Sequence, residues 1–264
     1  MSDNKVELDA EQVSPSSSAP SPPPVVSVII PVCNEAATLA KVIRQAFLVH
    51  KHTEVIVIEN GSTDGSKEIA ERAGARVFSF PHRLGHDVGR SLGAKEAKGD
   101  ILLFVDADFI IPAKEMIPLI QAVEQGVDVA LNKYNGNTSN KEIHRVVLAK
   151  YALNAILSRA DLQGNSMTSI PHAISRRALQ TIGAENLAIP PLAQTIAIQS
   201  GLRIRAPHYI EVGNRNRVRT HATPGDPVGD LILGDHLEAI GWLIQATDAR
   251  AHLLDKTRKR EKLR

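Results

Sequence analysis

The stretch Gly99-Asp-Ile-Leu-Leu-Phe-Val-Asp-Ala-Asp-Phe-Ile-Ile-Pro112 places two carboxylates directly after a run of apolar residues. The apolar run, residues 101–105, has the length and branching of a buried strand. Asp106 and Asp108 stand two residues apart, so on an extended segment their side chains point the same way. Paired carboxylates at the carboxyl end of a strand suit a hard divalent cation that also takes phosphate oxygens. The alternative is a polar turn with two solvated acids.

Upstream of this stretch, strand patterns alternate with helical patterns. Strands are expected at residues 25–32, 54–58 and 76–80, with a helix after each of them, the third running from Arg90 to about residue 98. This alternation predicts an α/β fold with a mostly parallel, Rossmann-like sheet and helices on both faces. Ligands of such sheets collect at the carboxyl ends of the strands.

A polar cluster follows each of these four strands. The clusters are Asn34 with Glu35, residues 59–64, residues 82–87, and Asp106 with Asp108. Their convergence on one sheet edge predicts a ligand site there. Within the third cluster, His82 and His86 are interpreted as loop surface, and the role of Asp87 stays open.

The second half of the chain has weaker signals. Helices are expected at residues 116–125, 142–159, 176–182 and 228–254, with strands at 127–131 and near 203–212. Residues 132–140 are interpreted as a polar loop, and residues 164–172 have no predicted strand.

Composition narrows the class of protein. A net charge of +2 over 264 residues argues against a nucleic-acid binder, so no nucleic-acid partner is expected. The single cysteine, Cys33, cannot form an internal disulfide, and no apolar run reaches the roughly 18 residues of a membrane span. No secretory signal is recognisable, so a cytoplasmic protein is expected. Residues 1–24 are rich in Ser and Pro and are predicted to be a disordered tail.

Four motifs carry a resemblance to a known family. They are Val28-Ile-Ile-Pro-Val-Cys-Asn-Glu35, Glu59-Asn-Gly-Ser-Thr-Asp-Gly65, Gly89-Arg-Ser91 with Gly99-Asp100, and Asp106-Ala-Asp108. Each motif is short, but in this order and spacing they resemble the family 2 glycosyltransferases, nucleotide-diphospho-sugar transferases of the GT-A fold. The resemblance is strong over residues 25 to about 135 and looser beyond.

The resemblance implies roles for individual residues. Pro31, Asn34 and Glu35 would border the nucleotide, and Glu59, beside the Gly61 turn, would contact the base. Arg90 would lie against the diphosphate, Asp106 would touch the ribose or a metal-bound water, and Asp108 would hold Mn²⁺ or Mg²⁺. Plainer alternatives are helix capping by Glu59 or Asp64 and a solvated first-turn position for Arg90.

The sequence departs from the family in its second half. Inverting members carry an acidic pair, one member of which is the general base, where this chain reads Ala188-Ile-Pro-Pro-Leu-Ala-Gln194. Proline and isoleucine cannot accept a proton, so the base role does not transfer. Glu185 or His172 could reach the acceptor, the enzyme could retain anomeric configuration, or the domain could bind a nucleotide sugar without turnover.

Two basic segments are candidates for anion contacts. The loop of residues 213–224 offers Arg217 to the diphosphate and His221 to the metal, the alternative being a solvated loop. The tail of residues 256–264 is a solvated helix end or a weak contact with anionic lipid at the inner membrane face.

The resulting hypothesis is one GT-A domain over residues 25–255, with a donor-binding half (25–131) and an acceptor-side half (132–255). It would move a sugar from a UDP- or GDP-type donor to a saccharide, lipid or small-molecule acceptor, with residues 165–172 lining the acceptor pocket. The alternatives are a non-catalytic nucleotide-sugar binding protein and a nucleotidyltransferase. The second is disfavoured because Val32-Cys-Asn-Glu-Ala-Ala lacks a glycine-rich loop.

Overall fold

The computed structural model describes residues 25–138, 141–213, 225–256, 258–259 and 262. The predicted tail of residues 1–24 lies outside them. The strands are β1 (Val26–Val32), β2 (Thr53–Asn60), β3 (Arg76–Phe80), β4 (Ile101–Phe104), β5 (Val129–Asn132), β6 (His172–Ser175) and β7 (Ile204–His208). The helices are α1 (Ala36–Phe47), α2 (Ser66–Arg72), α3 (Val88–Glu96), α4 (Ala113–Glu124), α5 (Arg145–Ile156), α6 (Arg176–Ile182), α7 (Pro190–Gln199) and α8 (Pro227–Ala246), with the 3-10 helices η1 (Ala160–Leu162) and η2 (Ala184–Ala188).

The strands form a single seven-stranded sheet with the order β3-β2-β1-β4-β6-β5-β7. β1 to β4 are mutually parallel where they pair, which confirms the predicted mostly parallel sheet. β6 runs antiparallel to both β4 and β5, while β7 pairs parallel with β5.

The sequence interpretation missed β6. This strand has only four residues, and its neighbours in the chain are a polar loop and a helix. Its identity depends on a partner far away in sequence: Phe104 of β4 pairs with His172, and Leu102 pairs with Ile174. Short strands of this kind take their structure from the sheet rather than from a local pattern.

The predicted final helix is also too long. α8 ends at Ala246, not near residue 254. The Asp248 carboxylate accepts hydrogen bonds from the backbone N–H groups of Arg250 (2.7 Å) and His252 (3.3 Å). Such local side-chain bonds offer the backbone an alternative to helix, which explains the early end.

Alternating side chains of β1 divide the core into two layers. Val28, Ile30 and Val32 pack with α1 and α4 on one face of the sheet. Ile29 packs on the other face, where α3 crosses close to the strand. This covering of both faces is the arrangement expected for a buried parallel sheet.

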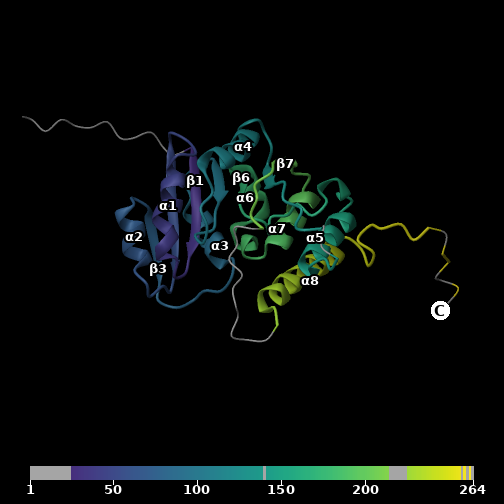
Figure 1. Cartoon of the computed structure of the whole chain (residues 1–264). Coiled ribbons are helices and arrows are strands. Elements are labelled where there is room, and N and C mark those ends of the chain that lie inside the picture. The colour runs from purple at the N-terminus through teal and green to yellow at the C-terminus, as the bar shows by residue number, and fades with distance from the viewer. Residues whose placement is uncertain (1–24, 139–140, 214–224, 257, 260–261, 263–264) are drawn as a thin grey trace, which may run out of the picture.

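A third apolar cluster joins α5, α7 and α8. It includes Leu153 from α5, Leu192 and Ile196 from α7, and Ala239 and Leu243 from α8. Figure 1 shows these three helices gathered at the end of the molecule away from β3. The cluster fixes α8 in position beside the carboxyl edge of the sheet.

Candidate active site

A cavity of about 630 Å³ opens where the carboxyl ends of β1, β2 and β4 meet. It receives a residue from each of the four predicted polar clusters: Glu35, Asn60, Asp87 and the pair Asp106 and Asp108. Pro31, Val32, Cys33, Arg83, Gly85, His86, Arg90, Ala107 and Val228 complete its lining. The convergence expected from strand topology is therefore present in the structure.

Hydrogen bonds join the loops that follow β1 and β2. The Asn34 side-chain oxygen accepts from the Thr63 N–H (2.8 Å), and the Asn34 N–H donates to the Ser62 hydroxyl (3.1 Å). The Asp64 carboxylate accepts from the Ala36 N–H (2.9 Å) at the start of α1. Asp64 also accepts from the N–H and hydroxyl groups of Ser66, which begins α2, although the N-cap residues are Glu35 for α1 and Gly65 for α2.

Arg90 is the centre of the buried charge in the cavity. Its Nη2 donates to Asp106 Oδ1 (2.9 Å), and its Nη1 donates to Asp87 Oδ1. Arg90 is 6% exposed and Asp87 7%, so this is an ion pair inside the protein rather than a solvated first-turn arginine. Burial alone would raise the pKa of Asp87, but Arg90 and His86 hold it below its usual range.

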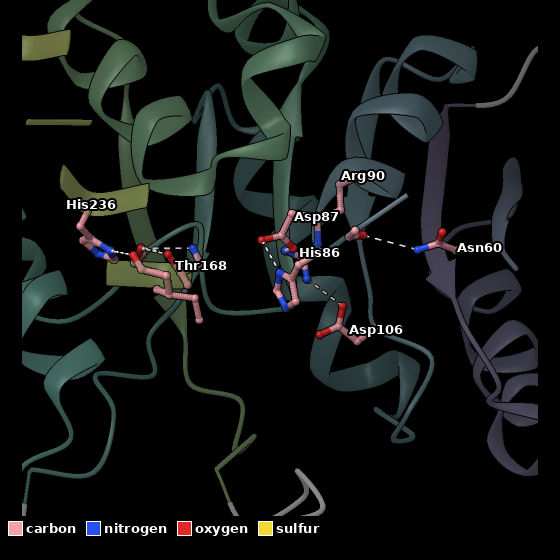
Figure 2. A network of polar contacts seen from close by, with 10 residues as sticks. Asn60, His86, Asp87, Arg90, Asp106, Thr168 and His236 are labelled. Atoms are coloured by element: carbon pink, nitrogen blue, oxygen red, sulfur yellow. Dashed lines mark hydrogen bonds and ion pairs between the residues drawn. The ribbon is translucent and has the colours of Figure 1, made fainter. Parts of the chain in front are cut away.

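His86 extends this cluster towards solvent. Its Nδ1 lies 2.8 Å from Asp87 Oδ2, and this hydrogen bond raises the pKa of His86. Figure 2 shows His86, Asp87, Arg90 and Asp106 connected to one another, with Asn60 to one side. His86 is exposed on the loop after β3, as interpreted from the sequence, and it also lines the cavity.

Helix α8 brings a further carboxylate to the cluster. Val228, in its first turn, lines the cavity, and Asp235 lies seven residues later on the same helical face. Burial and the neighbouring Asp87 carboxylate raise the pKa of Asp235 to about 6. Asp235 is therefore an acid close to the ionised Asp87.

The carboxylates at the end of β4 supply the oxygen ligands that a hard cation prefers. Asp106 is bound to Arg90 on one side and lines the cavity together with Asp108. Within the described ranges, no group of three or more His, Cys, Asp and Glu side chains is arranged to hold a metal. The pair fits a Mg²⁺-like ion that completes its shell with waters and substrate phosphates.

Two other predicted nucleotide contacts, Glu59 and Gly61, are not among the residues that line the cavity. Glu59 is buried and accepts a hydrogen bond from the Ser62 N–H. Gly61 has φ +67°, and a Cβ there would lie 3.2 Å from the backbone of His82 and Arg83. Asn60, between them, lines the cavity and bonds the Leu84 N–H, holding the loop after β3 in place.

The two base candidates occupy different environments. His172 is 2% exposed, packs against the Phe104 ring (centroids 4.9 Å apart), and burial lowers its pKa to about 3. Glu185 is exposed on η2. Neither lines the cavity. Gln194, at the expected place of the family base, is buried and bonds the Met167 N–H and Asn154 instead.

The sequence profile described as "Glycosyl transferase family 2" matches residues 27–183, which is more than half of the chain. The chain belongs to glycosyl transferase family 2. The residues of the sheet edge, from Pro31 to Asp108, all lie inside this family 2 segment.

Curated family 2 relatives include undecaprenyl-phosphate 4-deoxy-4-formamido-L-arabinose transferases. The Pseudomonas savastanoi protein is 32% identical over 120 residues (42% of this chain, 36% of the relative), and the Aeromonas hydrophila protein is 36% identical over 115 residues (40% and 35%). The matched segment therefore spans about a third of the length of these relatives.

Solved structures confirm the GT-A fold. Glucosyl-3-phosphoglycerate synthase from Mycobacterium tuberculosis, in complex with Mn²⁺, UDP and phosphoglyceric acid, superposes with a TM-score of 0.60 at 22% identity, covering 88% of this chain and 80% of that one. Its UDP–glucose complex with Mn²⁺ gives a TM-score of 0.58 at 22% identity, covering 88% and 81%.

Several family 2 predictions fall on residues that the structure does not describe. Arg217 and His221, the predicted diphosphate and metal ligands of the late basic loop, lie outside the described residues. So do residues 257, 260, 261, 263 and 264 of the basic tail. No helix among the described residues is long and apolar enough to span a bilayer.

Proposed function

We propose that this family 2 protein transfers a sugar from a nucleotide-diphosphate sugar, bound in the cavity at the sheet edge, to an acceptor oxygen. The observation that carries the proposal is the placement of buried Arg90 with Asp106 and Asp108 in one cavity. Departure of the sugar leaves additional negative charge on the diphosphate, which a fixed guanidinium offsets without reorganisation.

Arg90 is pre-organised for this task. Asp87 and Asp106 hold two of its nitrogens, and Nε has no hydrogen-bond partner in the described part of the chain. A diphosphate oxygen is a suitable acceptor for an arginine held in this way. Asp108, with Asp106, would hold Mn²⁺ or Mg²⁺, and the bound ion would supply Lewis-acid stabilisation of the leaving diphosphate.

The names of similar proteins support a donor and an acceptor class. The superposed synthase is described in complex with UDP and phosphoglyceric acid. The curated relatives are described as undecaprenyl-phosphate sugar transferases. We therefore propose a UDP- or GDP-type donor and an acceptor that carries a phosphate, either a lipid or a small molecule.

A non-catalytic nucleotide-sugar binding protein is the second candidate. It is favoured by one observation: no carboxylate stands at residues 188–194, where inverting relatives place their base. A retaining transfer accounts for the same observation, since it needs no base on the opposite face of the sugar. Release of UDP from a UDP-sugar with phosphoglyceric acid separates turnover from binding.

A thermal-shift panel tests the donor site. UDP-, GDP- and dTDP-sugars are offered with and without Mn²⁺ to the wild type, to Asp108→Ala, and to Asp100→Ala as the control at the other end of the same strand. A donor at 100 times its dissociation constant should add about 2.7 kcal/mol to the stability of the folded state. We expect a Mn²⁺-dependent rise in Tm with one nucleotide, lost in Asp108→Ala and kept in Asp100→Ala. No shift with any donor would contradict the proposal.

The location of the reaction is a separate proposal. A cytoplasmic protein whose basic tail, residues 256–264, contacts anionic lipid would meet a lipid-borne acceptor at the inner membrane face. Co-sedimentation with anionic vesicles, with and without the tail, tests this contact. Equal binding of both forms would rule out a role for the tail.

A further inference from the structure

A second cavity, of about 580 Å³, lies between α5 and α8 on the other side of the first turn of α8. Val228 lines the donor cavity, whereas the next residue, Gly229, and Ile232 line the second one. Successive residues of a helix point about 100° apart, so the two cavities flank adjacent faces of α8. A molecule in the second cavity is therefore beside the donor site.

Lys150 of α5 is one of the residues that line this second cavity. It is only 8% exposed, and its Nζ donates to the Ser169 hydroxyl at 2.8 Å. No carboxylate of the described residues forms an ion pair with it. A lysine ammonium has three donors, and a buried charge without a counter-charge is costly to a folded protein. One neutral hydroxyl leaves most of that cost in place.

Lys150 keeps its charge at neutral pH. Burial lowers its pKa to about 8, which still leaves the ammonium form dominant at pH 7. His236 of α8 is close enough for Lys150, together with burial, to lower its pKa, so this histidine is neutral and does not compete for an anion. His236 Nδ1 donates to the Ile232 carbonyl oxygen (2.6 Å), while Nε2 has no hydrogen-bond partner within the described ranges.

The other charged side chains around the second cavity are either paired with opposite charges or exposed to solvent. His144 Nε2 lies 3.0 Å from Asp226 Oδ2, and Arg145 pairs with Asp226 and Asp230. Glu142 is exposed at the rim, where solvent screens its repulsion of an anion. Among the described lining residues, Lys150 is the buried cation that no carboxylate neutralises.

We propose that the cavity between α5 and α8 binds the phosphate group of the acceptor, with the Lys150 ammonium as its principal ligand. This inference rests on the proposed transferase function, and it locates the acceptor on the second face of α8. A phosphate supplies both the missing counter-charge and acceptors for the unused Lys150 donors. The Ser169 hydroxyl, which accepts a hydrogen bond from Lys150, would keep the ammonium in place.

Under this proposal, residues 165–172 support the acceptor site from outside instead of lining it. Asn165, Ser166, Ser169 and His172 are buried and line neither cavity. Their contribution is indirect: Ser169 supports Lys150 from behind, and the Asn165 carbonyl accepts from Asn154 of α5 (3.0 Å). The segment positions α5, and α5 presents the cation.

Titration calorimetry on the full chain tests the proposal. The probes are inorganic phosphate, phosphoglyceric acid, and vesicles that contain a polyprenyl phosphate, with matched vesicles lacking it. The variants are Lys150→Met, Lys150→Gln, and Lys41→Met, which removes the same charge from the exposed face of α1. Because methionine is apolar and of similar length, we expect Lys150→Met to keep the fold, with a Tm no lower than that of the wild type.

We expect at least one phosphate probe to bind the wild type and Lys41→Met equally, and to bind both Lys150 variants at least tenfold more weakly. Binding of the soluble probes alone assigns a small-molecule acceptor, and binding of the polyprenyl phosphate vesicles alone assigns a lipid acceptor. Unchanged binding in the Lys150 variants, or no binding of any probe to the wild type, overturns the proposal.

UDP binding to the same variants separates this proposal from the transferase function. The Lys150 variants should bind UDP with Mn²⁺ as the wild type does, because Lys150 lies outside the donor cavity. If phosphate binding depends on Lys150 but no nucleotide binds, the anion site stands and the proposed function fails. If a nucleotide binds but phosphate binding is the same in the Lys150 variants, the proposed function stands and the anion site fails.

Discussion

Arg90 Nη2 lies 2.9 Å from Asp106 Oδ1, so a single guanidinium connects the first turn of α3 to the carboxyl end of β4. The same side chain also binds Asp87, which precedes α3. The loop after β3 and the acidic end of β4 are thus held in one arrangement by a buried charge before any ligand arrives. Pre-organisation of this kind is what electrostatic stabilisation of a leaving group requires.

Replacing Arg90 should damage stability as well as donor binding. Arg90→Met leaves the buried Asp87 carboxylate without its main counter-charge, and breaking such a pair costs about 3–5 kcal/mol. Urea denaturation at neutral pH measures the loss, with Arg44→Met on the exposed side of α1 as the control. A cost below about 1 kcal/mol, the usual worth of an exposed pair, would show that the pair is solvated in solution.

The first half of the fold could be predicted because its strands and helices are indicated by local sequence patterns. The apolar run before Asp106 and the alternation of strands with helices predict β1 to β4 without reference to any distant residue. The Asp106 and Asp108 pair was found for the same reason: the two acids are adjacent on one strand end, and parallel strands bring the other polar clusters to the same edge.

The parts that sequence reasoning missed depend on contacts between distant segments. Asp235 reaches the cluster only because α8 packs on α5 and α7. The local sequence of α8 does not predict this packing. Lys150 appears as a polar position in an amphipathic helix until the fold buries it. One signal was present in the sequence, an Asp235-His236 pair in the middle of a mostly apolar helix. Buried polar residues of this kind are candidates for function.

His86 should make stability depend on pH near neutrality. Its pKa is raised by the Asp87 carboxylate, so its contribution is complete below the ordinary histidine pKa of 6.5 and is lost as the pH rises through the raised value. We expect the wild type to exceed His86→Gln in unfolding free energy at about pH 5.5, and the difference to shrink at about pH 8.5. A constant difference across this range would contradict the ion pair.

Asp235 should affect the pH dependence of stability in the direction opposite to that of a paired carboxylate. Because its pKa is raised to about 6, its charged form is disfavoured in the folded protein, and the penalty grows as the pH rises through that value. Asp235→Asn should therefore stabilise the protein by roughly 1 kcal/mol at about pH 8, since partial exposure screens the effect, and should be neutral at about pH 4. Asp100→Asn, an exposed acid, should change stability little at either pH. Destabilisation by Asp235→Asn at about pH 8 would show that Asp235 has a favourable partner.

Two glycines in helices should respond in opposite directions to the same change. A Cβ on Gly93 of α3 would lie 2.4 Å from Ile29 Cγ2, because α3 crosses directly over β1. Overpacking of this kind costs about 1–3 kcal/mol, and moving α3 away would also displace Arg90. Gly93→Ala is therefore expected to lower both the unfolding free energy and the affinity for the donor.

Gly234 of α8 is the matched control for this substitution. A Cβ there meets no atom within 4 Å, so alanine should bring only its helix propensity, about 0.5–1 kcal/mol of stabilisation. Urea denaturation of both variants decides the matter, since the two substitutions add the same methyl group. Equal changes in unfolding free energy for the two variants would mean that α3 does not pack tightly against β1. The explanation that this close packing positions Arg90 at the end of β4 would then be wrong.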